Sequence, residues 1–209
     1  MPRPFVMDPA AFILRHLPLT PVPDVPDIML HLAAPQSGLS RLTRQTTPYW
    51  AYVWAGGAVL ALYVRDHPGA VQGKRVLDLG AGSGLVAIAA ARAGAIVIAA
   101  EIDPLGAVAI GLNAAANGVK MVVLTADLLD QEIPKVDLIL VGDLFYDPAL
   151  VTPVLAFLTR ATAQGIDILV GDPGRTPLPS ARLTALISYN VRDFGQTQPV
   201  PATVYRLGS

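Results

Sequence analysis

A glycine-rich turn places the strongest constraint on how this chain folds. Residues 78–84 read DLGAGSG, follow an apolar run and precede an alanine-rich segment. Glycine has no Cβ, so Gly80, Gly82 and Gly84 let backbone amides approach a ligand closely. The pattern predicts a strand, a ligand-binding turn and a helix, in that order.

The spacing of the turn narrows the class of ligand. Glu101 ends the next predicted strand, where an acid can hold the two hydroxyl groups of a ribose. A dinucleotide fingerprint reads G-x-G-x-x-G, but residue 85 is Leu and the third glycine comes too early. The pattern D-x-G-x-G-x-G, which begins at Asp78, resembles motif I of the class I methyltransferases that use S-adenosylmethionine.

The composition excludes several classes of function. The 209 residues fit one α/β domain with an N-terminal extension, and 53% of them are apolar. A net charge of −1 offers no basic face to a nucleic acid. The absence of cysteine excludes thiol catalysis, and the three histidines share no ligand spacing, so we expect no metal site. We expect a monomer in the cytoplasm. We expect no membrane span, because Pro48 and the pair Gly56-Gly57 interrupt the apolar stretch 45–64.

Strand-like and helix-like segments alternate through most of the chain. This order predicts a Rossmann-like α/β fold with a mostly parallel seven-stranded sheet and helices on both faces. A C-terminal antiparallel hairpin is expected to complete the sheet. The predicted strands span 74–79, 95–101, 119–125, 136–142, 165–171, 188–195 and 202–207, and the predicted helices span 55–67, 83–93, 104–116, 148–162 and 178–187.

The first 46 residues are predicted to form an extension to a methyltransferase domain at 47–209. Asp8 and Pro9 suit the start of a short helix over 8–17. Four prolines in 18–26 predict an extended connector, and 27–33 is predicted to be a short strand.

Acidic residues follow four of the predicted strands. Asp78, Glu101, Asp127 and Asp143 all lie at or just beyond a strand end. Ligands of doubly wound sheets bind beyond the carboxyl ends of the strands, so these acids are candidates for one site. Each acid taken alone is also explained by a helix cap or a solvated loop.

The resemblance to motif I implies contacts with S-adenosylmethionine. We expect Glu101 to bind the ribose, Asp127 to accept a hydrogen bond from the adenine amino group, and Asp78 to face the methionine amine. Ile102 and Leu128 are expected to enclose the adenine ring. The amides of the turn are expected to bind the methionine carboxylate; they belong to Gly80, Ala81, Gly82 and Gly84.

Three further motifs make the resemblance specific. The sequence DLFY at 143–146 resembles the post-II motif of the seven-β-strand protein lysine methyltransferases. The sequences TPYWAYVWAGG at 47–57 and GDPGR at 171–175 extend the similarity. Together they resemble the electron-transfer-flavoprotein β-subunit lysine methyltransferase family, in particular its bacterial members.

This resemblance implies methyl transfer from S-adenosylmethionine to a protein lysine ε-amine, on the β subunit of electron transfer flavoprotein, with S-adenosylhomocysteine as product. It assigns catalysis to Asp143, which would accept a hydrogen bond from the amine, and to Tyr146, which would help to place it. Arg175 would contact the substrate.

The aromatic residues before the helix at 55–67 admit two interpretations. In the functional one, Trp54 covers the cofactor while Tyr49 or Trp50 lines the lysine channel, since an aromatic face attracts a methylated ammonium. In the structural one, these rings only pack the start of the helix against the core.

Other functions stay open at this stage. A small-molecule N-methyltransferase would share every cofactor residue. A non-catalytic binding module would bind the cofactor without turnover. A nicotinamide-dependent oxidoreductase would bind a dinucleotide, which the early third glycine disfavours.

Overall fold

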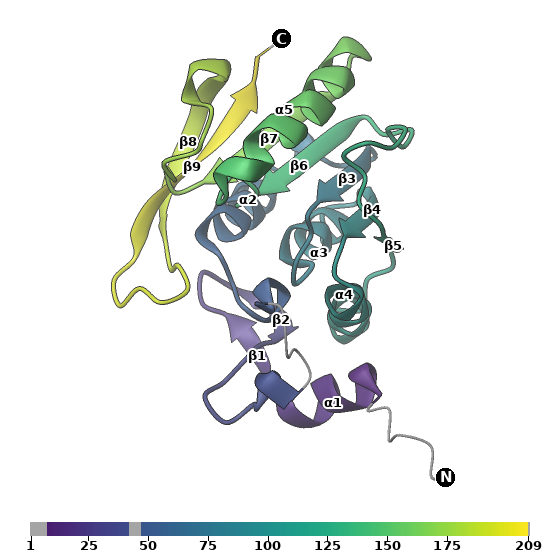
Figure 1. Cartoon of the computed structure of the whole chain (residues 1–209), viewed down its shortest axis with the longest axis vertical. Helices are drawn as coiled ribbons and strands as arrows, with labels where there is room; N and C mark the ends of the chain where they lie inside the picture. The colour runs from purple at the N-terminus through teal and green to yellow at the C-terminus, as the bar shows by residue number, and fades with distance from the viewer. Residues whose placement is uncertain (1–7, 42–46, 209) are drawn as a thin grey trace.

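A mixed seven-stranded sheet forms the centre of the protein (Figure 1). The computed structural model describes residues 8–41 and 47–208. The strands lie in the order β5-β4-β3-β6-β7-β9-β8, parallel from β5 to β7 and antiparallel at β9 and β8. The predicted sheet with its C-terminal antiparallel hairpin is confirmed. The strands are β3 (Arg75–Leu79), β4 (Ile96–Glu101), β5 (Val122–Thr125), β6 (Leu138–Gly142), β7 (Asp167–Asp172), β8 (Leu183–Val191) and β9 (Val200–Leu207).

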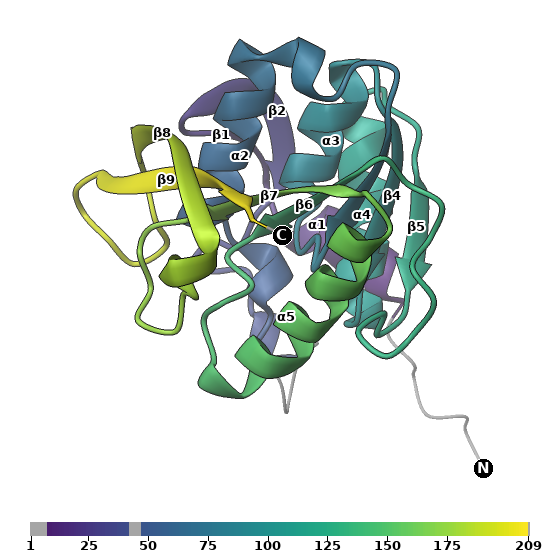
Figure 2. The same ribbon diagram turned by 90° about the horizontal axis from the view of Figure 1, so that it is seen from above.

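Helices cover both faces of the sheet (Figure 2). Parallel strands that are covered on both sides carry unbroken apolar runs in place of an alternating pattern. In β6, for example, residues 138–141 are all buried. The helices α2 (Ala55–Asp66), α3 (Leu85–Arg92) and α4 (Pro104–Ala116) pack on one face, and α5 (Pro148–Ala163) packs on the other.

Three helices begin with the same dipeptide, Asp-Pro. Asp8, Asp103 and Asp147 cap α1 (Pro9–His16), α4 and α5, and each carboxylate accepts a hydrogen bond from the amide two residues ahead. Proline suits the first helical position because its missing N–H would have no intrahelical partner there. Since α4 follows β4 and α5 follows β6, both capped helices begin beyond the carboxyl ends of the parallel strands.

The N-terminal segment packs against α4. The strands β1 (Leu19–Val22) and β2 (Val25–His31) form an antiparallel pair, so the predicted connector over 18–26 is wrong. Pro21 is tolerated in β1 because β1 pairs with a strand on one side only. The side chain of Asn113 in α4 accepts a hydrogen bond from the His31 amide at 2.8 Å. The predicted boundary after residue 46 stays a prediction, since 42–46 lie outside the described residues.

The predicted helix over 178–187 is also wrong. A single 3-10 turn at Ser180–Arg182 is followed by β8, which pairs with β9 from Leu183 to Val191. The local sequence of 182–187 is compatible with either a helix or a strand. Pairing with the long strand β9 makes most of this segment a strand. Both strands of the hairpin therefore begin earlier in the chain than the predicted strands over 188–195 and 202–207.

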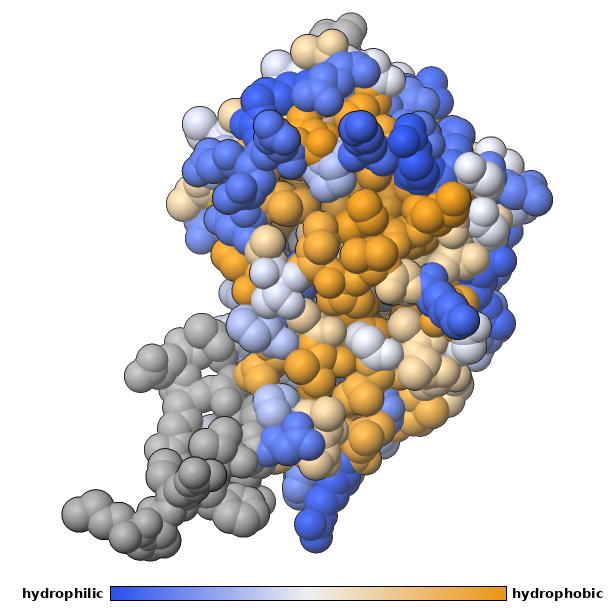
Figure 3. Space-filling model, turned by 90° about the vertical axis from the view of Figure 1, so that its right-hand side faces the viewer, coloured by the Kyte–Doolittle hydropathy of each residue, from blue (hydrophilic) through white to orange (hydrophobic). Residues whose placement is uncertain are grey.

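The side of the molecule that carries α4 and β5 is largely apolar (Figure 3). Val122 of β5 and Ile96 of β4 are among the exposed large apolar side chains. In the described ranges, the helices are all too short or too polar to span a bilayer.

Candidate active site

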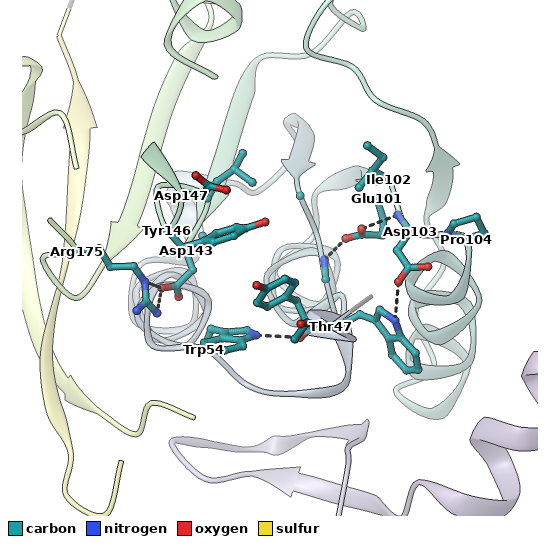
Figure 4. A pocket seen from close by; sticks show the side chains of 16 residues that line it. Thr47, Trp54, Glu101, Ile102, Asp103, Pro104, Asp143, Tyr146, Asp147 and Arg175 are labelled. Atoms are coloured by element: carbon teal, nitrogen blue, oxygen red, sulfur yellow. Dashed lines mark hydrogen bonds and ion pairs between the residues drawn. The ribbon is translucent and has the colours of Figure 1, made fainter. Parts of the chain in front are cut away.

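A cavity of about 750 Å³ lies at the carboxyl ends of β3, β4 and β6 (Figure 4). Its size falls within the range of small-molecule and cofactor sites. The turns after these three strands form its floor, and residues 47–54 with Arg175 complete its wall. One end of the cavity contains Glu101 and the other contains Asp143.

The glycine turn after β3 forms the first end. Gly80, Gly82 and Gly84 all have positive φ angles, between 53° and 82°, which side chains with a Cβ rarely adopt. A Cβ at Gly80 would also lie 2.8 Å from the side chain of Leu144. The turn therefore needs glycine both for its conformation and for its packing.

Glu101 is tied to this turn. It is 9% exposed, and its Oε2 accepts a hydrogen bond from the Gly82 amide at 2.8 Å, while its Oε1 accepts one from the Asp103 amide at 2.9 Å. Burial raises the pKa of Glu101 above its ordinary value. Each oxygen keeps a further lone pair, so the carboxylate can still accept hydrogen bonds from a ligand.

Trp50 belongs to the Glu101 end. It is almost fully buried, and its indole Nε1 donates a hydrogen bond to Asp103 Oδ2 at 3.0 Å. Figure 4 shows Asp103 beside Glu101, on the opposite side of the cavity from Asp143. Trp50 thus lies at the Glu101 end of the cavity, and its expected place in a lysine channel, as an alternative to Tyr49, stays a prediction.

Asp78 lies beneath the turn and does not line the cavity. Its side chain is buried, and its Oδ2 accepts a hydrogen bond from the Ala87 amide of α3 at 2.9 Å. Burial raises the pKa of Asp78 to about 7. This contact fixes α3 to β3, and the expected contact of Asp78 with a methionine amine stays a prediction.

Asp143 forms the second end, where it accepts three hydrogen bonds and forms an ion pair. Its Oδ2 accepts from the amides of Gly56 and Gly57 at the start of α2. Its Oδ1 accepts from Arg175 Nε at 2.7 Å and lies 2.5 Å from Nη2 of the same guanidinium. Both oxygens of the carboxylate are therefore engaged by protein groups. Burial raises the pKa of Asp143 to about 6, although the charge of Arg175 acts in the opposite direction.

Glycine is required where α2 meets the sheet. A Cβ at Gly56 would lie 2.1 Å from the carbonyl oxygen of Gly171, and a Cβ at Gly171 would meet Gly56 equally closely. Asp143 itself has a φ of +52°, the only positive value for a residue other than glycine in the described part of the chain. This backbone strain, together with the close approach, holds the carboxylate against the helix terminus.

Aromatic rings line the cavity at the Asp143 end. The ring of Tyr49 lies 5.1 Å from that of Tyr146 and 5.8 Å from that of Trp54. The guanidinium of Arg175 lies 5.8 Å from the Trp54 ring. Trp54 thus lies beside two predicted substrate residues, Tyr49 and Arg175, and its expected contact with the cofactor stays a prediction.

A family model described as lysine methyltransferase matches residues 39–177. The chain belongs to the lysine methyltransferase family. A Xenopus laevis protein named electron transfer flavoprotein beta subunit lysine methyltransferase is 38% identical to it over 196 residues, which cover 88% of this chain and 80% of the relative. The protein of the same name from Rattus norvegicus is 41% identical over 157 residues, which cover 72% of this chain and 62% of the relative.

Solved structures agree on the fold of this lysine methyltransferase. A putative RNA methyltransferase from Pyrococcus horikoshii aligns with a TM-score of 0.57 at 17% identity, covering 79% of this chain and 91% of that one. The T. Thermophilus 16S rRNA N2 G1207 methyltransferase, in complex with AdoMet and guanosine, aligns with a TM-score of 0.53 at 22% identity. That alignment covers 76% of this chain and 44% of the other. At these identities the likeness shows the fold alone.

The cavity of the lysine methyltransferase contains most of the residues that the sequence singled out. It is lined by Tyr49, Trp50, Trp54, Gly80, Gly82, Glu101, Ile102, Asp143, Tyr146 and Arg175. Five others lie outside its lining, namely Asp78, Ala81, Gly84, Asp127 and Leu128.

Two of these five follow β5 at the edge of the sheet. Leu128 is buried in the core beneath α5. Asp127 is exposed and accepts a hydrogen bond from the Leu129 amide, as in a local turn. The predicted adenine contacts of this pair therefore have no support from the lining of the cavity.

The sequence reasoning missed two acids of the cavity. Asp103 and Asp147 both line it, and both cap a helix that begins beside it. The signal that could have found them is the Asp-Pro dipeptide directly after a predicted strand end or its loop.

Proposed function

We propose that this lysine methyltransferase transfers a methyl group from S-adenosylmethionine to a lysine on the β subunit of electron transfer flavoprotein. The observation that carries the proposal is one continuous cavity with a nucleoside-type end at Glu101 and an aromatic, cation-containing end at Asp143. The names of the relatives support the flavoprotein as acceptor. A bacterial source, a cytoplasmic location and a monomeric state stay predictions.

The residues at the first end fit the cofactor. The glycine turn presents Gly80 and Gly82 to the cavity without side chains, and Glu101 retains acceptor positions for ribose hydroxyls. Gly80, Gly82 and Ile102 would contact the nucleoside, with Trp50 holding Asp103 in place. When bound, S-adenosylmethionine supplies an electrophilic methyl group on its sulfonium.

The second end must present a neutral amine. A free lysine has a pKa near ~10.4, so the acceptor has to lose a proton before it can attack. Burial among the aromatic rings disfavours the charged form of the amine, which lowers the pKa of an entering lysine. The proton leaves to water through the open mouth of the cavity.

We assign Asp143 a role that differs from the predicted hydrogen bond to the amine. Both of its oxygens are engaged by Arg175 and by the amides of α2, which disfavours a further contact with the amine. We assign it as a positioning residue that fixes Arg175 and the start of α2. The hydroxyl of Tyr146 points into the cavity (Figure 4), and we assign it to accept the hydrogen bond that orients the amine.

A direct assay tests the proposed acceptor. The purified enzyme is incubated with methyl-labelled cofactor and purified electron transfer flavoprotein, and the labelled residue is located by mass spectrometry. We expect the label on a lysine of the β subunit. Label found only on small metabolites would instead favour a small-molecule N-methyltransferase.

A pair of tyrosine variants tests the assigned hydroxyl. Tyr146→Phe should slow turnover by about tenfold to a hundredfold, because the amine loses its orienting hydrogen bond. Tyr205→Phe, on β9 and away from the cavity, is the matched control and should turn over normally. Equal rates for the two variants would remove Tyr146 from the mechanism.

A further inference from the structure

The tip of the β8–β9 hairpin is fastened beside the Asp143 end of the cavity. Asp193 lies in this tip, is 10% exposed at its side chain, and accepts a hydrogen bond from the Ala55 amide at 3.1 Å. Trp54, the N-cap residue of α2, makes no side-chain capping bond. An acid 138 positions away in sequence therefore caps the helix whose next two amides bind Asp143.

Arg175 joins the hairpin tip to the cavity. Its Nη2 lies 2.5 Å from Asp143 Oδ1 and 3.6 Å from Asp193 Oδ2. The guanidinium thus lies between one carboxylate from the cavity and one from the hairpin. Because both contacts are largely buried, the tip has a fixed position relative to the reacting end.

Phe194 extends the aromatic lining of the cavity onto the surface. Its ring lies 3.9 Å from that of Tyr52 and 5.4 Å, edge-on, from that of Trp54. Trp54 contacts Tyr49, and Tyr49 contacts Tyr146 inside the cavity. We call these five residues the aromatic strip. Phe194 is its outer end and is 48% exposed.

The length of a lysine side chain decides what can cover this outer end. Four methylene groups separate the ε-amine from the backbone. When the amine lies beside Tyr146, the backbone that carries it lies at the mouth, and its neighbours extend onto the rim. A small amine would fill the cavity without reaching Phe194.

We propose that Phe194, held in place by Asp193, is a specificity residue that contacts the polypeptide flanking the target lysine. The inference rests on the proposed lysine acceptor and adds the place where the acceptor's backbone docks. The hairpin lies beyond residues 39–177, the part of the chain that the family model matches. Substrate selection by a hairpin beyond this matched segment would let related enzymes keep one reaction centre and act on different proteins.

Two acceptors of different size test this proposal. One is the electron transfer flavoprotein β subunit, and the other is N-acetyl-lysine methylamide, which carries the ε-amine without flanking residues. Phe194→Ala should raise KM for the protein by about tenfold, the loss expected for an aromatic contact at an interface. It should leave kcat for the protein and all parameters for the small acceptor unchanged. Leu186→Ala, another exposed apolar residue of the same hairpin, should alter neither reaction.

The outcomes separate the inference from the proposed function. An unchanged KM for Phe194→Ala, or an equal loss with both acceptors, would overturn the role of Phe194. If the wild-type enzyme does not methylate the flavoprotein, only that acceptor is refuted. The variants are then compared on the proteins that the wild-type enzyme labels in a cell extract. There, selective loss of protein labelling in Phe194→Ala supports the inference and unchanged labelling refutes it. Wild-type transfer only to the small acceptor would also refute it.

Discussion

The two ends of the cavity are built from different kinds of contact. At the Glu101 end, the main residues come from one short stretch of chain and the strand that follows it, and Gly82 and Glu101 are 19 positions apart. At the Asp143 end, α2, the loops after β6 and β7, and the hairpin tip meet through contacts of 32 to 138 positions. The first end is therefore a local motif, and the second is a product of the whole fold.

This difference predicts different responses to mutation. A change at the Glu101 end should weaken cofactor binding and leave folding intact, because the motif has few distant partners. A change at the Asp143 end should disturb folding and turnover together, because each group there holds several segments. The following variants test that contrast.

The largest effect is expected for Asp143→Ala. It leaves Arg175 without its main partner and two amides of α2 without an acceptor. Breaking a buried ion pair costs about 3–5 kcal/mol of unfolding free energy, and turnover should be lost as well. Denaturant unfolding and the methyl-transfer assay measure the two effects. Asp137→Ala, which breaks the exposed pair with Arg75, is the control and should alter neither greatly.

If Asp143→Ala keeps its fold but loses turnover, the role assigned to Asp143 changes. Such a result would mean that the carboxylate acts on the substrate itself and that its contacts with α2 are dispensable. Normal turnover would remove Asp143 from both roles.

Adjacent glycines of α2 provide the second test. A Cβ at Gly56 would collide with the Gly171 carbonyl, whereas one at Gly57 would meet only Val86 at 3.8 Å. Gly56→Ala should lose about 1–3 kcal/mol of unfolding free energy through overpacking. Gly57→Ala should be neutral or stabilising, since alanine favours helix. Similar melting temperatures for the two variants would show that the helix does not approach the sheet as closely as described.

The same contrast explains what the sequence could predict. The glycine turn and Glu101 were recognisable because their chemistry repeats at fixed spacing along the chain. The parallel strands were recognisable because burial on both faces leaves unbroken apolar runs. Asp193 carried no such signal, since its partners at Ala55 and Arg175 are brought to it only by the completed sheet.

The errors have the same physical origin. The segment over 178–187 lacks a decisive local pattern, and pairing with β9 makes most of it a strand. Trp50 and Trp54 are only four residues apart, yet a 3-10 turn at Tyr49–Ala51 sends them to opposite ends of the cavity. Which ring faces which ligand depends on that turn, and spacing alone does not reveal it.

The third prediction concerns the Glu101 end. Glu101→Gln removes the charge that we propose binds ribose hydroxyls, and hydrogen bonds to charged groups contribute about 1.5–3 kcal/mol. Affinity for S-adenosylhomocysteine, measured by calorimetry, should fall by about tenfold or more, with little change in the unfolding midpoint. Asp127→Asn is the comparison and should bind normally, because Asp127 does not line the cavity. A matching loss in Asp127→Asn would restore its predicted contact with adenine.

A further expected effect is a change in the pH dependence of stability. Burial raises the pKa of Asp78 from 3.8 to about 7, so the native state holds this proton more tightly than the unfolded chain does. The resulting stabilisation is complete below about pH 4 and is lost as the pH rises through 7. Asp143, with a pKa of about 6, acts in the same direction.

Asp78→Asn removes one of these two titrations. Its unfolding free energy, measured by denaturant between pH 4 and pH 8, should fall less steeply with pH than that of the wild type. The slope is the informative quantity, because the buried amide also lowers stability at every pH. Asp137→Asn serves as a control with an unchanged slope, since its partner Arg75 lowers the pKa of Asp137 to about 2, below this pH range. Equal slopes for Asp78→Asn and the wild type would mean that water reaches Asp78, and the contact between α3 and β3 would then be looser than the rest of the Glu101 end.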